Sequence, residues 1–319
     1  MPAPDSTPPW ERVGGQRSAA RLPLGGQRRR EHAAPAQARS RGALSSRARR
    51  DGGPSPSRLR GDRAYPLFWL APCPPSGSTP RGDAVLVAAV HFTPAFGELR
   101  ANRKALVDCV REAADAGARV VVLPELATTG FALDAETAER WAEAIDGPTA
   151  AALGAASAER ETTVVVGLPL REEGRLHNAQ LVLDRGRVAG VYRKHHLYGC
   201  DFVWAAPGPS AGAVVETSAG AVGLLVCHDL AYPRTVAAVA AERPRLLAFS
   251  TAWIGSGESL PAEWLLAVRL LDPAPLVAAN RGGREGTLRF ADPSAILSHA
   301  RGGIVGPRGA ARRVLVAEV

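Results

Sequence analysis

The pattern of hydrophobic and polar positions changes near residue 85. From there to the end, short apolar runs rich in β-branched residues alternate with alanine-rich stretches whose apolar positions recur at helical spacing. The first runs, Val85–Val90, Leu99–Ala116 and Val120–Leu123, predict a strand, a helix that stops at Gly117, and a second strand. Continued alternation of this kind predicts a layered α/β domain over residues 83–319.

A β-hairpin is predicted in the middle of the chain. Extended runs at Asn178–Leu183 and Arg187–Tyr192 flank Asp184-Arg185-Gly186, whose residue types favour a turn. Lys194 therefore follows a strand end. The other predicted elements are a helix capped by Asp134, helices that begin near Pro148, Pro233 and Pro261, and strands at Thr163–Gly167, Val214–Glu216, Ala221–Val226, Leu246–Phe249, Leu276–Ala279 and Arg313–Val319.

Charge separates a leader, residues 1–82, from this body. The leader holds 15 arginines, no lysine and five acids, whereas the rest of the chain holds 24 basic and 26 acidic residues. The high overall pI of about 10.0 thus originates in a segment rich in Arg, Pro, Gly and Ser. Such a composition cannot bury enough surface to offset the entropy of ordering, so a disordered leader is predicted. Nucleic acid is expected as a partner only through this segment.

Cysteine use and hydropathy indicate a reduced, cytoplasmic protein. Cys73, Cys109, Cys200 and Cys227 are widely separated and form no CxxC pair, unlike the dense cysteines of a disulfide scaffold. The apolar stretch Leu67–Ala71 is too short for the core of a signal peptide. No apolar run approaches the length of a membrane span, so no membrane partner is expected.

Three reactive side chains stand where predicted strands end. Cys227 follows the apolar run Val222–Val226, and Glu125 follows the strand that ends at Leu123. Lys194 is one of only two lysines in an arginine-rich chain. Taken singly, each has an ordinary alternative as a buried thiol, a helix N-terminal charge or a solvated amine. Together they supply the groups needed for acyl transfer through a thioester.

The segments around these residues resemble the nitrilase superfamily, which carries Glu, Lys and Cys in this order. The matching segments are LPELATTG around Glu125, YRKHHL around Lys194, CHDLAYP from Cys227 and LVAANRGGREG around Asn280. The resemblance implies an α-β-β-α sandwich that assembles as a homodimer or a higher homo-oligomer. It also implies that no metal or organic cofactor is required.

By this resemblance Glu125 is the general base, Cys227 the nucleophile, and Lys194 the group that stabilises the oxyanion together with the backbone N–H after Cys227. The expected reaction is hydrolysis of a small amide or N-carbamoyl compound, and less so of a nitrile. Asp229 favours the amidase-like branches, because nitrile-specific branches more often have Glu there. Tyr198, His228 and Trp253 are candidates for the substrate pocket.

The sequence departs from the family pattern at four places. Asp201 stands where many members have a second catalytic glutamate, and this candidate auxiliary carboxylate is expected to reach less far. Arg234 replaces a usual acid after Pro233, and Phe290–Ser294 lacks a glycine common before the serine. The chain also ends without the C-terminal extension that many members have, which suggests truncation. These departures motivate an alternative, a degenerate member that binds a small molecule or a protein without turnover.

A second alternative is an isochorismatase-like hydrolase, which also orders an acid, a lysine and a cysteine but builds them on a three-layer fold around one sheet. Its acid is normally Asp. The Pro124-Glu125 setting, the hairpin before Lys194 and the Asn280 segment all favour the nitrilase-like interpretation.

Overall fold

The structure of the chain is a computed structural model that describes residues 84–319 except 258, 300 and 307–311. The predicted disorder of the basic leader and the predicted domain boundary at residues 82 and 83 lie outside the described residues. Among the residues that are described, no helix is long and apolar enough to cross a membrane.

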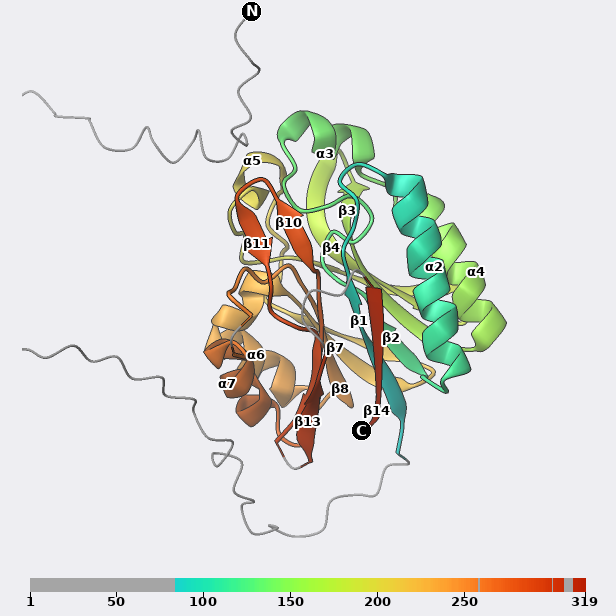
Figure 1. Cartoon of the computed structure of the whole chain (residues 1–319), viewed down its shortest axis with the longest axis vertical. Helices are drawn as coiled ribbons and strands as arrows, with labels where there is room; N and C mark the ends of the chain where they lie inside the picture. The colour runs from blue at the N-terminus through green and yellow to red at the C-terminus, as the bar shows by residue number, and fades with distance from the viewer. Residues whose placement is uncertain (1–83, 258, 300, 307–311) are drawn as a thin grey trace, which may run out of the picture. The chain divides into compact units, whose positions relative to one another are not determined.

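Two six-stranded sheets form the centre of the described body (Figure 1). In each sheet three neighbouring strands run parallel, and the remaining pairs are antiparallel. In spatial order the first sheet contains β14 (Arg312–Glu318), β1 (Leu86–Phe92), β2 (Val120–Val122), β3 (Thr163–Glu172), β4 (Arg175–Asp184) and β5 (Arg187–Arg193). The second contains β13 (Gly302–Val305), β12 (Ala295–Ser298), β9 (Leu276–Asn280), β8 (Leu246–Thr251), β7 (Gly220–Val226) and β6 (Ala213–Thr217).

Helices cover the outer face of each sheet. Helices α2 (Leu99–Asp115) and α4 (Pro148–Arg160) lie on the first sheet, and α6 (Pro233–Ala241) and α7 (Ala262–Leu271) lie on the second (Figure 1). This is the predicted α-β-β-α sandwich. Because it has two sheets, the isochorismatase-like alternative with its single sheet is wrong.

Strand β1 shows why these apolar runs become central strands. Val87 and Ala89 face the core between the two sheets, whereas Ala88 and Val90 face the core beneath α2 and α4. All four side chains are fully buried. A strand covered on both faces needs apolar residues at consecutive positions, which is the pattern seen in the sequence.

Helix starts also follow the local signals. The Asp134 side chain accepts a hydrogen bond from the Thr137 N–H, so that a capping box opens α3 (Ala135–Trp141), as predicted. Pro148 occupies the first turn of α4. Pro233 does the same for α6, where the following residue, Arg234, is exposed.

The structure extends one predicted strand and adds elements that the sequence pattern did not predict. Strand β3 continues to Glu172, since it pairs with β4 along its whole length and turns through Glu173 and Gly174, both at positive φ. The short helix α5 (Asp201–Trp204) and the hairpin of β10 (Gly283–Glu285) and β11 (Leu288–Phe290) have no clear periodicity in the sequence. The strand predicted at the end of the chain is confirmed as β14, which pairs with β1.

Candidate active site

The three predicted reactive residues come from the ends of three strands in two different sheets. Glu125 lies shortly after β2, and Lys194 directly follows β5, both in the first sheet. Cys227 directly follows β7 in the second sheet. The candidate site therefore spans one end of the sandwich, where the carboxyl ends of these strands meet.

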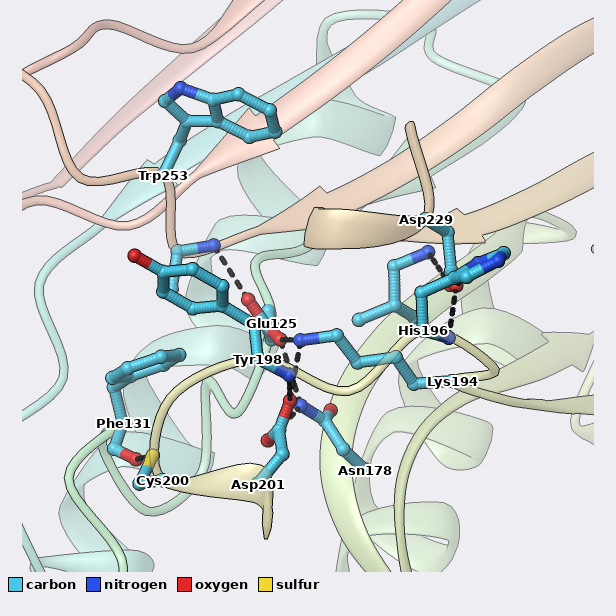
Figure 2. Close-up of polar contacts among 12 residues, drawn as sticks. Glu125, Phe131, Asn178, Lys194, His196, Tyr198, Cys200, Asp201, Asp229 and Trp253 are labelled. Carbon is cyan, nitrogen blue, oxygen red and sulfur yellow. Dashed lines mark hydrogen bonds and ion pairs between the residues drawn. The ribbon is translucent and has the colours of Figure 1, made fainter. Parts of the chain in front are cut away.

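The Glu125 carboxylate is fully buried and accepts three hydrogen bonds. Its Oε1 accepts from Lys194 Nζ at 2.7 Å and from Asn178 Nδ2 at 2.8 Å. Its Oε2 accepts from the backbone N–H of Ala252, also at 2.8 Å. These donors come from both sheets, so they fix the orientation of the carboxylate relative to the two halves of the sandwich (Figure 2).

The segment that carries Glu125 passes unusually close to strand β3. A Cβ atom on Gly167 would lie 2.5 Å from Glu125 Cα and 2.5 Å from the Pro124 oxygen. Only glycine fits at that position, and Gly167 also donates its N–H to the Pro124 oxygen at 3.1 Å. Because Gly167 has no side chain, the segment can lie close enough to β3 for the Glu125 carboxylate to reach the site.

Lys194 lies between two carboxylates. Its Nζ donates to Glu125 Oε1 and to Asp201 Oδ2, both at 2.7 Å, and the side chain is fully buried. Burial alone would lower the pKa of Lys194, but the Asp201 and Glu125 carboxylates outweigh burial and hold this pKa well above its ordinary value. The site therefore contains a permanent, desolvated positive charge at neutral pH.

Asp201 contacts Lys194 even though aspartate is shorter than the glutamate expected at its position. It is the first residue of α5, is fully buried, and accepts from Asn178 Nδ2 at 3.0 Å through Oδ1. Its Oδ2 accepts from the Tyr198 N–H at 3.1 Å in addition to Lys194. In Figure 2 the side chains of Glu125, Lys194, Asp201 and Asn178 point toward one another.

Cys227 opens a 3₁₀ turn, η2 (Cys227–Ala231), with a backbone φ of 45° in the left-handed region. Such a conformation is uncommon for a residue with a Cβ and is typical of functional turns. The thiol side chain is buried, with 5% of the residue exposed. Burial raises the pKa of the Cys227 thiol and the Glu125 charge raises it further, against a smaller lowering by Lys194, so the resting thiol is protonated.

The Asp229 side chain holds the turn η2 in place through hydrogen bonds. The side chain is fully buried, and its Oδ2 accepts from the Val226 N–H at 3.1 Å and from the Tyr192 hydroxyl at 2.8 Å. Val226 is the residue before Cys227, and Tyr192 lies on β5 two residues before Lys194. Asp229 therefore connects the segment of the thiol to the segment of the ammonium group.

A cavity of about 160 Å³ lies beside Cys227. The three residues predicted to form the substrate pocket, Tyr198, His228 and Trp253, all line it. The structure thus brings them together with the candidate nucleophile. The complete lining consists of Tyr198, Cys227, His228, Ala252, Trp253 and Ile254.

Sequence reasoning missed Asn178 and the N–H of Ala252 as parts of the site. The available signal for Asn178 was a polar residue in an apolar strand, repeated two positions later at Gln180. Residues two apart share a face of a strand, and both of these side chains are fully buried in the space between the sheets. Gln180 Nε2 reaches across to the Ser250 hydroxyl on β8 at 2.9 Å. The N–H of Ala252 left no signal, because every residue except proline has one.

Asn280, at the end of β9, supports the cavity wall. Its Oδ1 accepts from the Trp253 N–H at 2.8 Å, and its Nδ2 donates to the Asp292 oxygen at 2.9 Å. The Asp292 side chain in turn accepts from the Gly257 N–H at 2.7 Å. The segment that lacks the family's glycine is thus hydrogen-bonded to the loop of Trp253.

Two further histidines next to Lys194, His195 and His196, are held by contacts within the protein. His195 Nδ1 lies 2.8 Å from the Gly208 oxygen, and His196 contacts Asp229. Within the part of the chain that the structure describes, no group of three or more His, Cys, Asp and Glu side chains is arranged to hold a metal ion.

Comparison with known proteins gives one consistent family. The carbon-nitrogen hydrolase family model matches residues 86–319. A probable nitrilase of Schizosaccharomyces pombe is 26% identical over 232 residues, covering 70% of this chain and 81% of that protein. Human deaminated glutathione amidase is 30% identical over 220 residues, covering 63% of this chain and 65% of that protein. The solved structure of an amidase from Nesterenkonia sp. has a TM-score of 0.62 and 26% identity, covering 77% of this chain and 94% of that one.

Proposed function

The chain belongs to the carbon-nitrogen hydrolase family, within the nitrilase superfamily, and on this premise we propose that it hydrolyses a small amide through a thioester on Cys227. Glu125 acts as the general base, and Lys194 stabilises the negative charge that develops on the substrate oxygen. The observation that carries the proposal is the convergence of these residues: Lys194 Nζ lies 2.7 Å from the Glu125 carboxylate, and both charges act on the buried Cys227 thiol.

The protonation states support a base-assisted attack. Because the resting Cys227 thiol is protonated, it needs a proton acceptor when it attacks. Glu125 takes the proton as Sγ bonds to the carbonyl carbon, and then gives it to the departing nitrogen, so that ammonia or an amine leaves and the thioester remains. Water activated by Glu125 then attacks the thioester, which releases the carboxylic acid and restores the thiol.

Lys194 suits the stabilisation of the oxyanion because its charge is already desolvated and fixed. The ammonium group is held by Glu125 and Asp201, so no solvent reorganisation is needed when charge develops on the substrate. The backbone N–H of His228, the residue after Cys227, is proposed as the second donor. A related observation supports the nucleophile: a solved structure of a mutant of the Nesterenkonia amidase has the acetamide moiety of fluoroacetamide covalently added at its active-site cysteine.

The test combines intact-protein mass spectrometry with an ammonia assay on a panel of short amides, N-carbamoyl compounds and nitriles. We expect ammonia release and a transient acyl adduct in the wild type, and neither in Cys227→Ala. The matched control is Cys109→Ala, because Cys109 is buried on α2, outside the site, and should leave both signals intact. Ammonia release that persists in Cys227→Ala would reject the mechanism, and a folded protein inert to the whole panel would favour the alternative of binding without turnover.

Some expectations from the sequence stay predictions. They are the cytoplasmic location, assembly as a homodimer or a higher homo-oligomer, and the restriction of any nucleic-acid binding to the leader, residues 1–82. Transfer of the acyl group to an amine instead of water is distinguished by the product formed in the same mass-spectrometric experiment.

A further inference from the structure

The cavity beside Cys227 restricts the size of the group attached to the reacting carbon. Its volume is about 160 Å³. An engineered apolar cavity of about 150 Å³ in an unrelated protein holds a benzene molecule, whereas sites for drug-sized ligands start at about 300 Å³. The cavity therefore has room for a single ring or a short branched chain.

The lining of the cavity offers no fixed positive charge to a substrate. None of the six described lining residues is Asp, Glu, Lys or Arg. His228 is the one imidazole among them, and burial, followed by the positive charge of Lys194, lowers its pKa, so it is mostly neutral near pH 7. Lys194 itself is fully buried and already paired with two carboxylates. A carboxylate on a substrate would enter this cavity without a cationic partner, so the hydration it loses there would not be replaced by an ion pair.

The walls of the cavity are held by buried polar side chains rather than by free loops. The N–H of Trp253 is bonded to Asn280 Oδ1 at 2.8 Å, and the N–H of Tyr198 to Asp201 Oδ2 at 3.1 Å. The Trp253 ring also packs edge to face against Trp264, with ring centroids 6.0 Å apart and an interplanar angle of 78°. The size and polarity of the cavity thus belong to the fold and are present before a substrate arrives.

We infer that the substrate is an uncharged amide whose acyl group is a short branched chain or a single ring, and that amides and N-carbamoyl compounds bearing a carboxylate are disfavoured. This inference rests on the proposed function, because it assumes that the substrate carbonyl meets Cys227. The observations that carry it are the volume, the neutral lining and the fixed walls of one cavity.

The test compares two amides that differ at one end. Butyramide ends in a methyl group where succinamate has a carboxylate. We expect kcat/KM for ammonia release to be roughly 100-fold higher for butyramide, which is the scale set by leaving a charge unpaired. Benzamide and its 4-carboxy derivative form a second pair with the same expected direction.

A charge-introducing variant sharpens the comparison. Ile254 lines the cavity and is 38% exposed, so an arginine there reaches the mouth of the site. In Ile254→Arg, kcat/KM for succinamate relative to butyramide should rise about threefold to tenfold. The matched control is Ile254→Gln, which brings a long polar side chain without charge and should leave the ratio unchanged.

The outcomes separate the two proposals. If succinamate is hydrolysed as well as butyramide in a reaction that Cys227→Ala abolishes, the inference is overturned while the proposed function stands. If neither amide releases ammonia, the proposed function is the one in doubt, and calorimetric binding to Cys227→Ala still decides the inference. Tighter binding of butyramide supports the inference, and tighter binding of succinamate overturns it.

Discussion

Asp229 Oδ1 accepts the backbone N–H of His196 at 2.8 Å and also lies 3.0 Å from the Nδ1 of the same residue. One carboxylate oxygen thereby fixes the loop that follows Lys194. The other oxygen fixes the residue before Cys227, as described above. We therefore predict that Asp229 is a positioning residue, because its hydrogen bonds set where the Lys194 ammonium group and the Cys227 thiol lie relative to each other.

Asp229→Asn should lower kcat about tenfold or more and change KM little. In the wild type the two carboxylate oxygens accept hydrogen bonds from the backbone N–H groups of Val226 and His196. Whichever way the asparagine amide is oriented, its NH₂ group would face one of these two donors, and such a mismatch costs about 1–3 kcal/mol. Steady-state kinetics at fixed pH measures the changes in kcat and in KM separately. The control is Tyr192→Phe, which removes one hydrogen bond to Asp229 and should have a smaller effect. Equal loss in both variants, or a change in KM alone, would contradict the positioning role.

Asp201→Asn should move the alkaline limb of the kcat/KM profile to lower pH. Burial lowers the pKa of Lys194, and Asp201 is the strongest of the groups that raise it. Without the Asp201 charge, the pKa of Lys194 should therefore fall. The protonated amine is then lost at a lower pH, while the wild-type limb stays above the ordinary lysine value of about 10.4. Profiles of both proteins from about pH 6 to pH 11 measure the shift. Asp201→Glu keeps the charge and serves as the control. An unchanged limb in Asp201→Asn would show that Lys194 does not control activity at high pH.

The resting Cys227 should give no thiolate absorption at neutral pH. Its pKa is raised by burial and by Glu125, so the thiol stays protonated through the ordinary cysteine value of about 8.5. The ultraviolet difference spectrum between the wild type and Cys227→Ala, titrated from about pH 7 to pH 10, tests this directly. A thiolate band already present near pH 7 would mean that the base does not need to act during the attack.

Gly167→Ala should reduce both stability and activity. The new methyl group would meet the backbone around Glu125 at 2.5 Å, and forcing it in costs about 1–3 kcal/mol and displaces Glu125, the proposed general base. Urea unfolding and ammonia release measure the two effects. The matched control is Gly154→Ala in α4, where the nearest atom is 3.4 Å away and a helix gains from alanine. A variant as stable and as active as the wild type would mean that the Glu125 segment can shift without consequence.

Local signals in the sequence predicted most elements and the placement of the reactive residues at strand ends. Runs such as Val120–Leu123 and Val222–Val226 specify strands because both of their faces are buried. Asp134 starts a helix through its side-chain cap, and Pro148 does so through its fixed backbone angle. Elements such as α5 and the β10–β11 hairpin were not predictable in this way, because their short segments carry no period and gain their structure from distant contacts. Glu285 of β10, for example, accepts the N–H groups of Phe131 and Ala132.

By itself, the sequence determined the α/β class and the identities of Glu125, Lys194 and Cys227 as candidates. The resemblance of its motifs to the nitrilase superfamily implied the sandwich of two sheets. Only the tertiary structure decided that Lys194 is shared by two carboxylates, that Asn178 and the Ala252 N–H complete the environment of Glu125, and that the cavity walls are neutral. The physical reason is distance along the chain. Glu125 is 53 residues from Asn178 and 127 residues from Ala252. The first contact depends on the order of strands within one sheet, and the second on how the two sheets pack, and a local pattern encodes neither.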